Sequence, residues 1–171
     1  MWLYTILLGI SVGFVCYVDV SGVILFLLLI CLCWVKRGAG KSAFWFLRYV
    51  TIVATGHLVW PALQAAQILS QKGVSAEVID IHTIKPLDEE AILSSANKTR
   101  AVVTAEEHSC NGGLGDAVCQ LLGRKLPTPV EMVAVNDKFG ESGTSMQLMN
   151  EYHLNADAIV ESSLKAIARK N

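Results

Sequence analysis

The sequence lacks the patterns that indicate a disulfide framework, a metal site or a nucleic-acid-binding surface. Its five cysteines include no C-x-x-C pair, and three of them lie in the apolar first 35 residues. His57, His82 and His153 are too far apart in the sequence to suggest metal ligands, so we expect them in turns or on the surface. From residue 51 onward, 14 acidic side chains outnumber 10 basic ones, and this balance gives no indication of nucleic-acid binding.

Charge is nearly absent from residues 1–35, where Asp19 is the only charged side chain. A helix of this whole segment would be about 52 Å long, too long for a hydrocarbon core of about 30 Å. Residues 20–35 are the most apolar part and predict a single membrane span. Lys36 and Arg37 follow it and favour a cytoplasmic side for the rest of the chain.

Two other interpretations of residues 1–35 remain open. One is a helical hairpin that turns at residues 19–22, and the other is a non-native extension caused by a misplaced start or a frame error. A cleaved signal peptide is disfavoured, because the charged leading region and the small-residue cleavage site are missing. Without a membrane anchor, we expect the chain to be cytoplasmic.

Residues 36–49 form a basic and aromatic linker. Basic side chains flank the aromatic cluster of residues 44–46, as is typical of a segment in the lipid headgroup region, although a linker or a buried edge fits equally well. Residues 38–42 resemble the end of a phosphate-binding P-loop. Val35 stands where that motif requires its first glycine, so the P-loop interpretation fails.

Residues 50–171 alternate between strand and helix patterns. Short apolar runs predict strands at residues 50–54, 75–81, 101–105 and 131–135. Helices are predicted at residues 61–72, after Asp88, from Asp116 and after Asn155. This alternation predicts a three-layer α/β/α sandwich with a mostly parallel sheet.

Helical spacing also predicts which side chains face the sheet. In the first helix these are Leu63, Ala66 and either Leu69 or Ser70. In the last helix the predicted stripe consists of Val160, Leu164, Ile167 and Ala168.

A glycine-rich stretch follows the predicted strand at residues 101–105. Gly112, Gly113 and Gly115 precede a helix and can present backbone N–H groups to a phosphate or carboxylate. The spacing matches neither G-x-G-x-x-G nor the P-loop, which favours a simpler role in turning the chain and packing it close to the strand. Glu106, Glu107 and His108 stand where this strand should emerge into solvent, so they could serve as acid or base groups.

A second polar, glycine-bearing loop follows the strand at residues 131–135. It should lie at the same sheet edge, where Asp137, Lys138 and Glu141 could line a cleft. A solvated loop in which Ser142, Thr144 or Ser145 caps a short helix is the favoured alternative. The predicted ligand-binding edge therefore consists of Glu106, His108, Gly112, Gly113, Gly115, Asp137 and Glu141.

From about residue 50 to 170 the sequence resembles the C-terminal domain of transketolase. The resemblance rests on several motifs in the same order, at residues 54–56, 81–88, 104–109, 112–115 and 139–144. It implies a domain shared with deoxyxylulose-phosphate synthase and with the β subunits of 2-oxoacid dehydrogenases. It also implies a mixed, mostly parallel sheet covered by helices.

The resemblance further implies transfer of a two-carbon ketol unit between sugar phosphates, with thiamine diphosphate and a divalent cation such as Mg²⁺. In the family these are held by two domains that precede this one, so we expect no cofactor, metal or catalytic residue in this chain alone. The resemblance then implies a homo- or hetero-oligomer with a chain that carries the thiamine-binding domains. The alternative is a membrane-anchored, non-catalytic binding module on the same fold.

Overall fold

Strands and helices alternate along residues 48–170, the part of the chain that the structure, a computed structural model, describes. The strands are β1 (Tyr49–Ala54), β2 (Ser75–Asp80), β3 (Val102–Ser109) and β4 (Val130–Val135). A short 3-10 helix, η1 (Gly56–Leu58), precedes the helices α2 (Val59–Gln71), α3 (Glu89–Thr99), α4 (Leu114–Lys125), α5 (Ser145–Glu151) and α6 (Ala156–Ala168).

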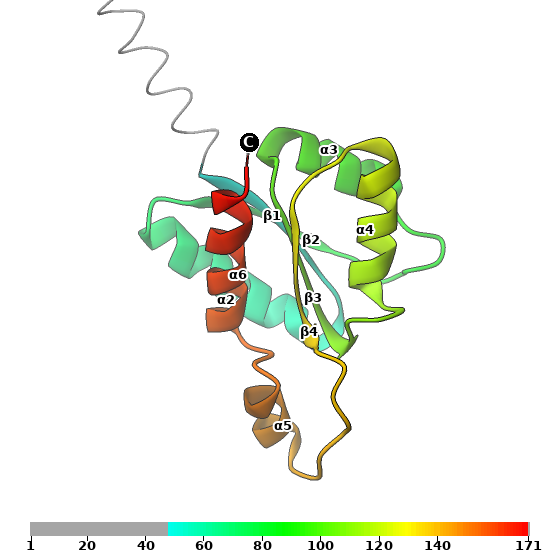
Figure 1. The fold of residues 1–171 in the computed structure, drawn as a ribbon. Helices are drawn as coiled ribbons and strands as arrows, with labels where there is room; N and C mark the ends of the chain where they lie inside the picture. Colours follow the sequence, from blue (N-terminus) through cyan, green and yellow to red (C-terminus); the bar gives the residue numbers. More distant parts are fainter. Residues whose placement is uncertain (1–47, 171) are drawn as a thin grey trace, which may run out of the picture. The chain divides into compact units, whose positions relative to one another are not determined.

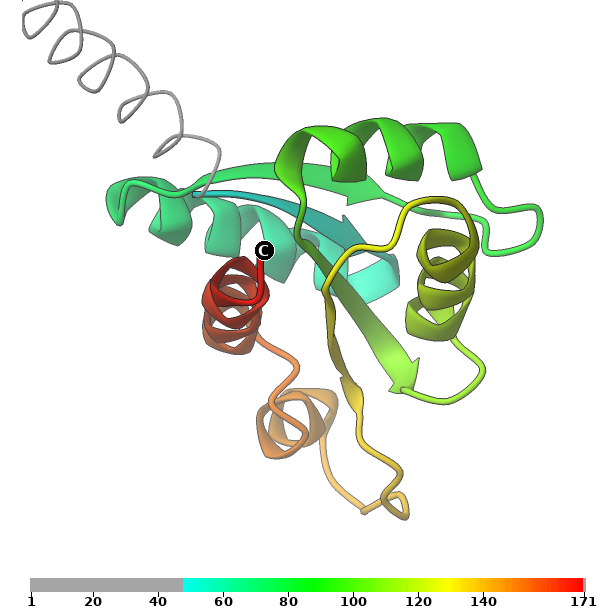
Figure 2. The same cartoon turned by 45° about the horizontal axis from the view of Figure 1, so that its top comes forward.

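The four strands form a parallel sheet in the order β2-β1-β3-β4. Helices α2 and α6 cover one face, and α3 and α4 cover the other (Figures 1 and 2). The predicted α/β/α sandwich is confirmed. Every pairing among the described strands is parallel, so the antiparallel strand of the predicted mixed sheet is not among residues 48–170.

The central strand β1 and the first half of β3 are mostly apolar and buried, as expected for strands that helices cover on both faces. Thr51 in β1 is a buried exception. Its Oγ1 atom lies 2.7 Å from the hydroxyl oxygens of both Ser95 and Thr99 on α3. This hydroxyl cluster satisfies the polar groups beneath α3 and fixes that helix against the middle of the sheet.

Two predicted helix starts are confirmed by capping contacts, whereas α2 and α4 begin two residues earlier than predicted, at Val59 and Leu114. Asp88 accepts a hydrogen bond from the Ala91 N–H at 3.0 Å, and Asn155 accepts one from the Ala158 N–H at 3.0 Å. Thr144 precedes α5, and its backbone N–H donates to the Gln147 side-chain oxygen at 2.9 Å.

The predicted inner face of α2 is only partly correct. Leu69 is buried, but Leu63 is 48% exposed and Ala66 is half-buried. The other buried residues of this helix are Ala62 and Ala65. Two small side chains face the sheet, which lets α2 pack closely on it and turns the bulkier leucine outward.

The predicted stripe of α6 is displaced in a similar way. Val160 is buried as expected, whereas Leu164 is 41% exposed, Ile167 is half-buried and Ala168 is exposed. The buried positions of this helix are Ile159, Val160, Ser163 and Ala166. The prediction missed Ser163 because serine is polar and is not expected on the buried face of a helix. Here its hydroxyl donates a hydrogen bond to the Ile159 carbonyl oxygen at 2.7 Å, which allows its burial.

The predictions for residues 1–35 and 36–49 fall almost entirely outside the described residues. The membrane span, the helical hairpin and the non-native extension therefore stay predictions. Among residues 48–170, no helix combines the length and apolarity needed to cross a bilayer.

Candidate functional site

The carboxyl end of β3 differs from its prediction. The strand continues to Ser109, so Glu106 is a strand residue rather than the start of an exposed loop. Only 1% of its surface is exposed. Its carboxylate accepts hydrogen bonds from the backbone N–H groups of Leu114 at 2.7 Å and Gly115 at 2.8 Å. The chain thus supplies its own anion to the N-terminus of α4, where backbone donors and the helix dipole stabilise negative charge.

This contact explains the need for glycine at position 113. A Cβ atom there would lie 2.1 Å from Oε2 of Glu106, well inside van der Waals contact. Gly115 is restricted by packing instead, because its Cβ would lie 2.7 Å from the sulfur of Met132. Both glycines therefore allow α4 to approach the sheet, in agreement with the simpler of the two interpretations of this loop.

Gly112 has a third role at the turn. Its φ of 83° lies in the left-handed region, and its N–H donates to the Asp116 carboxylate at 2.6 Å. Of the loop's backbone donors, those of Gly112, Leu114 and Gly115 are thus engaged by acidic side chains of this chain.

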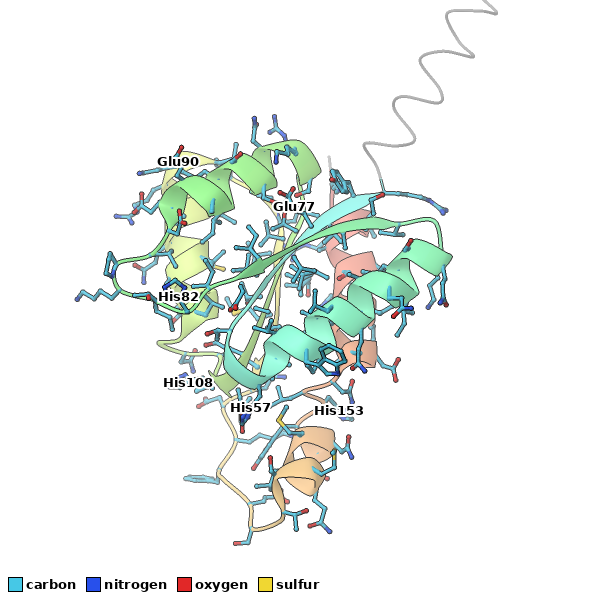
Figure 3. All side chains as sticks on the ribbon, turned by 180° about the vertical axis from the view of Figure 1, so that it is seen from behind. His57, Glu77, His82, Glu90, His108 and His153 are labelled. Carbon is cyan, nitrogen blue, oxygen red and sulfur yellow. The ribbon has the colours of Figure 1, made fainter. Side chains whose placement is uncertain are left out.

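A cleft of about 370 Å³ opens between the ends of β1 and β3. Its lining comes from the segment after β1, from the end of β3 and from two connecting loops, and comprises Thr55, Gly56, His57, Ile84, Glu106, Glu107, His108, Gly112 and Gly113. We call it the switch-point cleft. Figure 3 shows His57 and His108 at the same end of the sheet.

His57 and Glu107, two residues of the cleft lining, contact each other. Nδ1 of His57 lies 2.7 Å from Oε2 of Glu107, and the two side chains are 76% and 45% exposed. His108 is also exposed, and its Nδ1 lies 3.0 Å from the Ser109 carbonyl oxygen. Among residues 48–170, neither histidine Nε2 atom has a hydrogen-bond partner.

The structure brings together only part of the predicted ligand-binding edge. Glu106, His108, Gly112 and Gly113 line the switch-point cleft, and Gly115 lies just behind it in α4. Asp137 and Glu141 do not line it. The prediction missed His57 and Glu107 as a pair, because they are fifty positions apart in the sequence and only the pairing of β1 with β3 makes them neighbours.

Asp137 and Glu141 belong to an exposed segment at residues 136–152, which we call the α5 arm. It carries no buried residue along α5, and Phe139 and Met146 are 98% and 73% exposed. The Tyr152 hydroxyl holds the arm together by accepting from the Glu141 N–H at 2.9 Å and donating to the Phe139 carbonyl oxygen at 3.2 Å. Figure 1 shows α5 displaced from the sheet and its covering helices.

The described residues do not fit a bound divalent cation with a diphosphate. Residues 48–170 contain no group of three or more histidine, cysteine, aspartate or glutamate side chains placed to hold a metal ion. The anion site at the start of α4 is filled by Glu106. Cys119 on α4 offers no reactive thiolate, because burial, and secondarily the charge of Asp116, raises its pKa.

Comparison with known proteins places this geometry in a family. The family model of the transketolase C-terminal domain matches residues 48–159. A 6-deoxy-6-sulfo-D-fructose transketolase subunit from Clostridium sp. (strain MSTE9) is 49% identical over 122 residues, covering 71% of this chain and 38% of the relative. A 1-deoxy-D-xylulose-5-phosphate synthase from Halothermothrix orenii is 38% identical over 120 residues, covering 69% of this chain and 19% of the relative.

A solved structure, described as a split gene transketolase in an inactive beta4 tetramer, is 47% identical and superimposes with a TM-score of 0.70. The match covers 72% of this chain and 41% of that one. The chain thus spans well under half the length of the relatives it matches. Because the family model covers more than half of the sequence and the same fold recurs in a close relative, the chain belongs to the transketolase C-terminal domain family.

Proposed function

We propose that this chain is the C-terminal part of a transketolase-type enzyme and works within a larger or split assembly. In that assembly it supports two-carbon ketol transfer between sugar phosphates without supplying reacting groups. The observation that carries the proposal is the 49% identity to a transketolase subunit, over an alignment that covers only 38% of that subunit. The remaining length of such relatives is where thiamine diphosphate and Mg²⁺ would be held.

Large apolar side chains on the surface support a partner. Trp60 and Leu63 project from one face of α2 and are 68% and 48% exposed, and Leu164 on the neighbouring α6 is 41% exposed. Phe139 and Met146 on the α5 arm are exposed further still. Large apolar side chains that gather on a protein surface often mark interfaces. The partner that we propose for this surface is a chain that carries the thiamine-binding domains. The matched relatives are long enough to contain such domains.

The proposal makes this chain a scaffold whose role is contact and stability. Its helices and arm would position the neighbouring domains, while the chemistry takes place in the cofactor-binding part. The folded domain would then lie in the cytoplasm, where sugar phosphates are found.

Native mass spectrometry of the chain isolated from its own cells in mild detergent tests the proposal. We expect a complex that contains a second chain and the mass of thiamine diphosphate. We also expect ketol transfer by the complex and none by the isolated chain. A matched preparation stripped of thiamine diphosphate should lose activity while keeping this chain bound.

The alternative function predicts a different result. A membrane-anchored binding module would be recovered intact and alone in the membrane fraction, and would show no associated thiamine diphosphate. That outcome would overturn the transketolase role, and so would ketol transfer by this polypeptide in the absence of any other chain.

A further inference from the structure

The switch-point cleft lies where the strand order of the sheet reverses direction. From β1 the chain passes through α2 to β2 on one side, and from β2 it passes through α3 to β3 on the other side of β1. The connections that leave β1 and β3 therefore run to opposite faces of the sheet. Open α/β sheets bind ligands in the crevice that this divergence creates at the carboxyl ends of the strands.

The size of the cleft suits a small molecule. Its volume of about 370 Å³ is near the lower end of the range for small-molecule sites, about 300 to 1,000 Å³. Ile84 supplies an apolar surface in the lining, because its side chain is 41% exposed. A flat apolar ring would find van der Waals contact on this surface.

The charges of the cleft select against an anionic ligand. The backbone donors that would bind a phosphate at the start of α4 are engaged by Glu106. Glu107 adds a second carboxylate beside them, and its Oε2 atom lies 2.7 Å from Nδ1 of His57. A phosphate dianion would therefore meet like charge, with no described lysine or arginine in the lining to offset it.

The remaining polar groups suit hydroxyls. The Nε2 atoms of His57 and His108 have no partner within residues 48–170, and Glu107 uses only one carboxylate oxygen in its contact with His57. A carboxylate at the carboxyl end of a parallel strand is a recurrent acceptor for ribose hydroxyls in open α/β sheets. Two imidazole nitrogens and a carboxylate can together bind a vicinal diol.

From this combination we propose that the switch-point cleft binds an uncharged nucleoside, with the base on the Ile84 surface and the ribose hydroxyls on Glu107 and His57. The proposal goes beyond the transketolase role and does not depend on it. The native mass spectrum reports the partner chain, whereas a nucleoside titration reports the cleft. The partner chain and the nucleoside site can therefore each be disproved without affecting the other.

Titration of the full chain with adenosine and with AMP, followed by ligand-detected NMR, tests the proposal. We expect saturable binding of adenosine and binding of AMP that is about tenfold weaker, since each tenfold step corresponds to about 1.4 kcal/mol. Glu107→Gln should weaken adenosine binding about fivefold and narrow the gap between adenosine and AMP, because it removes the charge that repels phosphate.

Glu141→Gln is the matched control. It removes an exposed carboxylate from the α5 arm, outside the cleft lining, and should leave both affinities unchanged. The Glu107 side chain is 45% exposed, so Glu107→Gln should fold like the native chain. The proposal is overturned by absence of saturable adenosine binding, by tighter binding of AMP than of adenosine, or by a Glu107→Gln affinity equal to that of Glu141→Gln.

Discussion

Two polar, glycine-bearing segments follow neighbouring strands of the sheet, and in each a single side chain makes two hydrogen bonds to the backbone. In the turn between β3 and α4 this side chain is Glu106, which is buried and binds two backbone N–H groups. In the α5 arm after β4 it is Tyr152, whose hydroxyl binds one N–H and one carbonyl near the surface. Similar sequence patterns have thus produced an internal structural contact in one place and an exposed projection in the other.

The two segments differ in whether their structure requires glycine. In the β3–α4 turn, glycine is required because a buried carboxylate occupies the space of a side chain. In the arm, Gly140 has no atom within 4 Å of an added Cβ, so position 140 has room for a side chain. The following variants test this contrast.

The largest effect should come from Gly113→Ala. The added Cβ would lie 2.1 Å from Glu106 Oε2, so either the carboxylate or the helix must move. We expect the free energy of unfolding to fall by about 3 kcal/mol, at the upper end of overpacking costs. Urea unfolding of the full chain, followed by far-UV circular dichroism, measures the change.

Gly140→Ala is the control for that variant and should change the free energy of unfolding by no more than about 0.5 kcal/mol. Equal urea midpoints for the two variants would contradict the close approach of Glu106 to the turn.

Glu106→Gln should be the next most disruptive substitution. The amide keeps one acceptor oxygen but directs an NH₂ group at a backbone N–H, so one buried donor loses its partner. We expect a loss of about 2 kcal/mol in the free energy of unfolding. Glu107→Gln, at the next residue of the same strand, changes an exposed contact with His57 and should cost less than about 0.5 kcal/mol. A larger cost at Glu107 than at Glu106 would reverse the assignment of the buried contact.

Tyr152→Phe should affect the arm alone. Removal of the hydroxyl frees the Glu141 N–H and the Phe139 carbonyl, a loss of about 1 kcal/mol that is confined to local opening. Amide hydrogen exchange should become several-fold faster at Glu141. The Val74 amide, which donates to the Leu69 carbonyl at 2.9 Å outside the arm, is the internal control and should exchange at its native rate. Equal acceleration at both amides would mean that Tyr152 supports more than the arm.

Phe139→Ala should have the smallest effect on stability. The side chain is 98% exposed, so the free energy of unfolding should change by less than about 0.5 kcal/mol. In the proposed assembly the same variant should weaken association about tenfold, because an exposed aromatic is a frequent anchor of interfaces. Native mass spectrometry of a concentration series, with Lys138→Ala as control, measures this. Unchanged association would remove the arm from the interface.

Much of the fold could be predicted from the sequence, because it rests on local signals. The apolar runs that mark the strands and the caps at Asp88 and Asn155 each depend on a few adjacent residues. The inner faces of α2 and α6 were harder to predict. A leucine such as Leu63 looks like a core residue in any helical pattern, but the depth of packing that small alanines allow depends on the sheet beneath.

The candidate site could be predicted less well, and Glu106 shows why. A charged residue after an apolar run normally marks the end of a strand, and here its charge is compensated by N–H groups eight and nine residues later. The contact between His57 and Glu107 could not be predicted for a similar reason. It depends on strand register, which the sequence of either strand alone does not contain.

The strand order also governs when the switch-point cleft can exist. Parallel strands cannot be joined by hairpins, so each pairing in this sheet must close a loop that includes a helix. In the chain β1, α2 and β2 all precede β3, and β3 pairs with the edge of β1 that β2 leaves open. The cleft exists only once β3 has paired with that edge, so it depends on a contact between residues about fifty positions apart, the kind of long-range contact that slows folding.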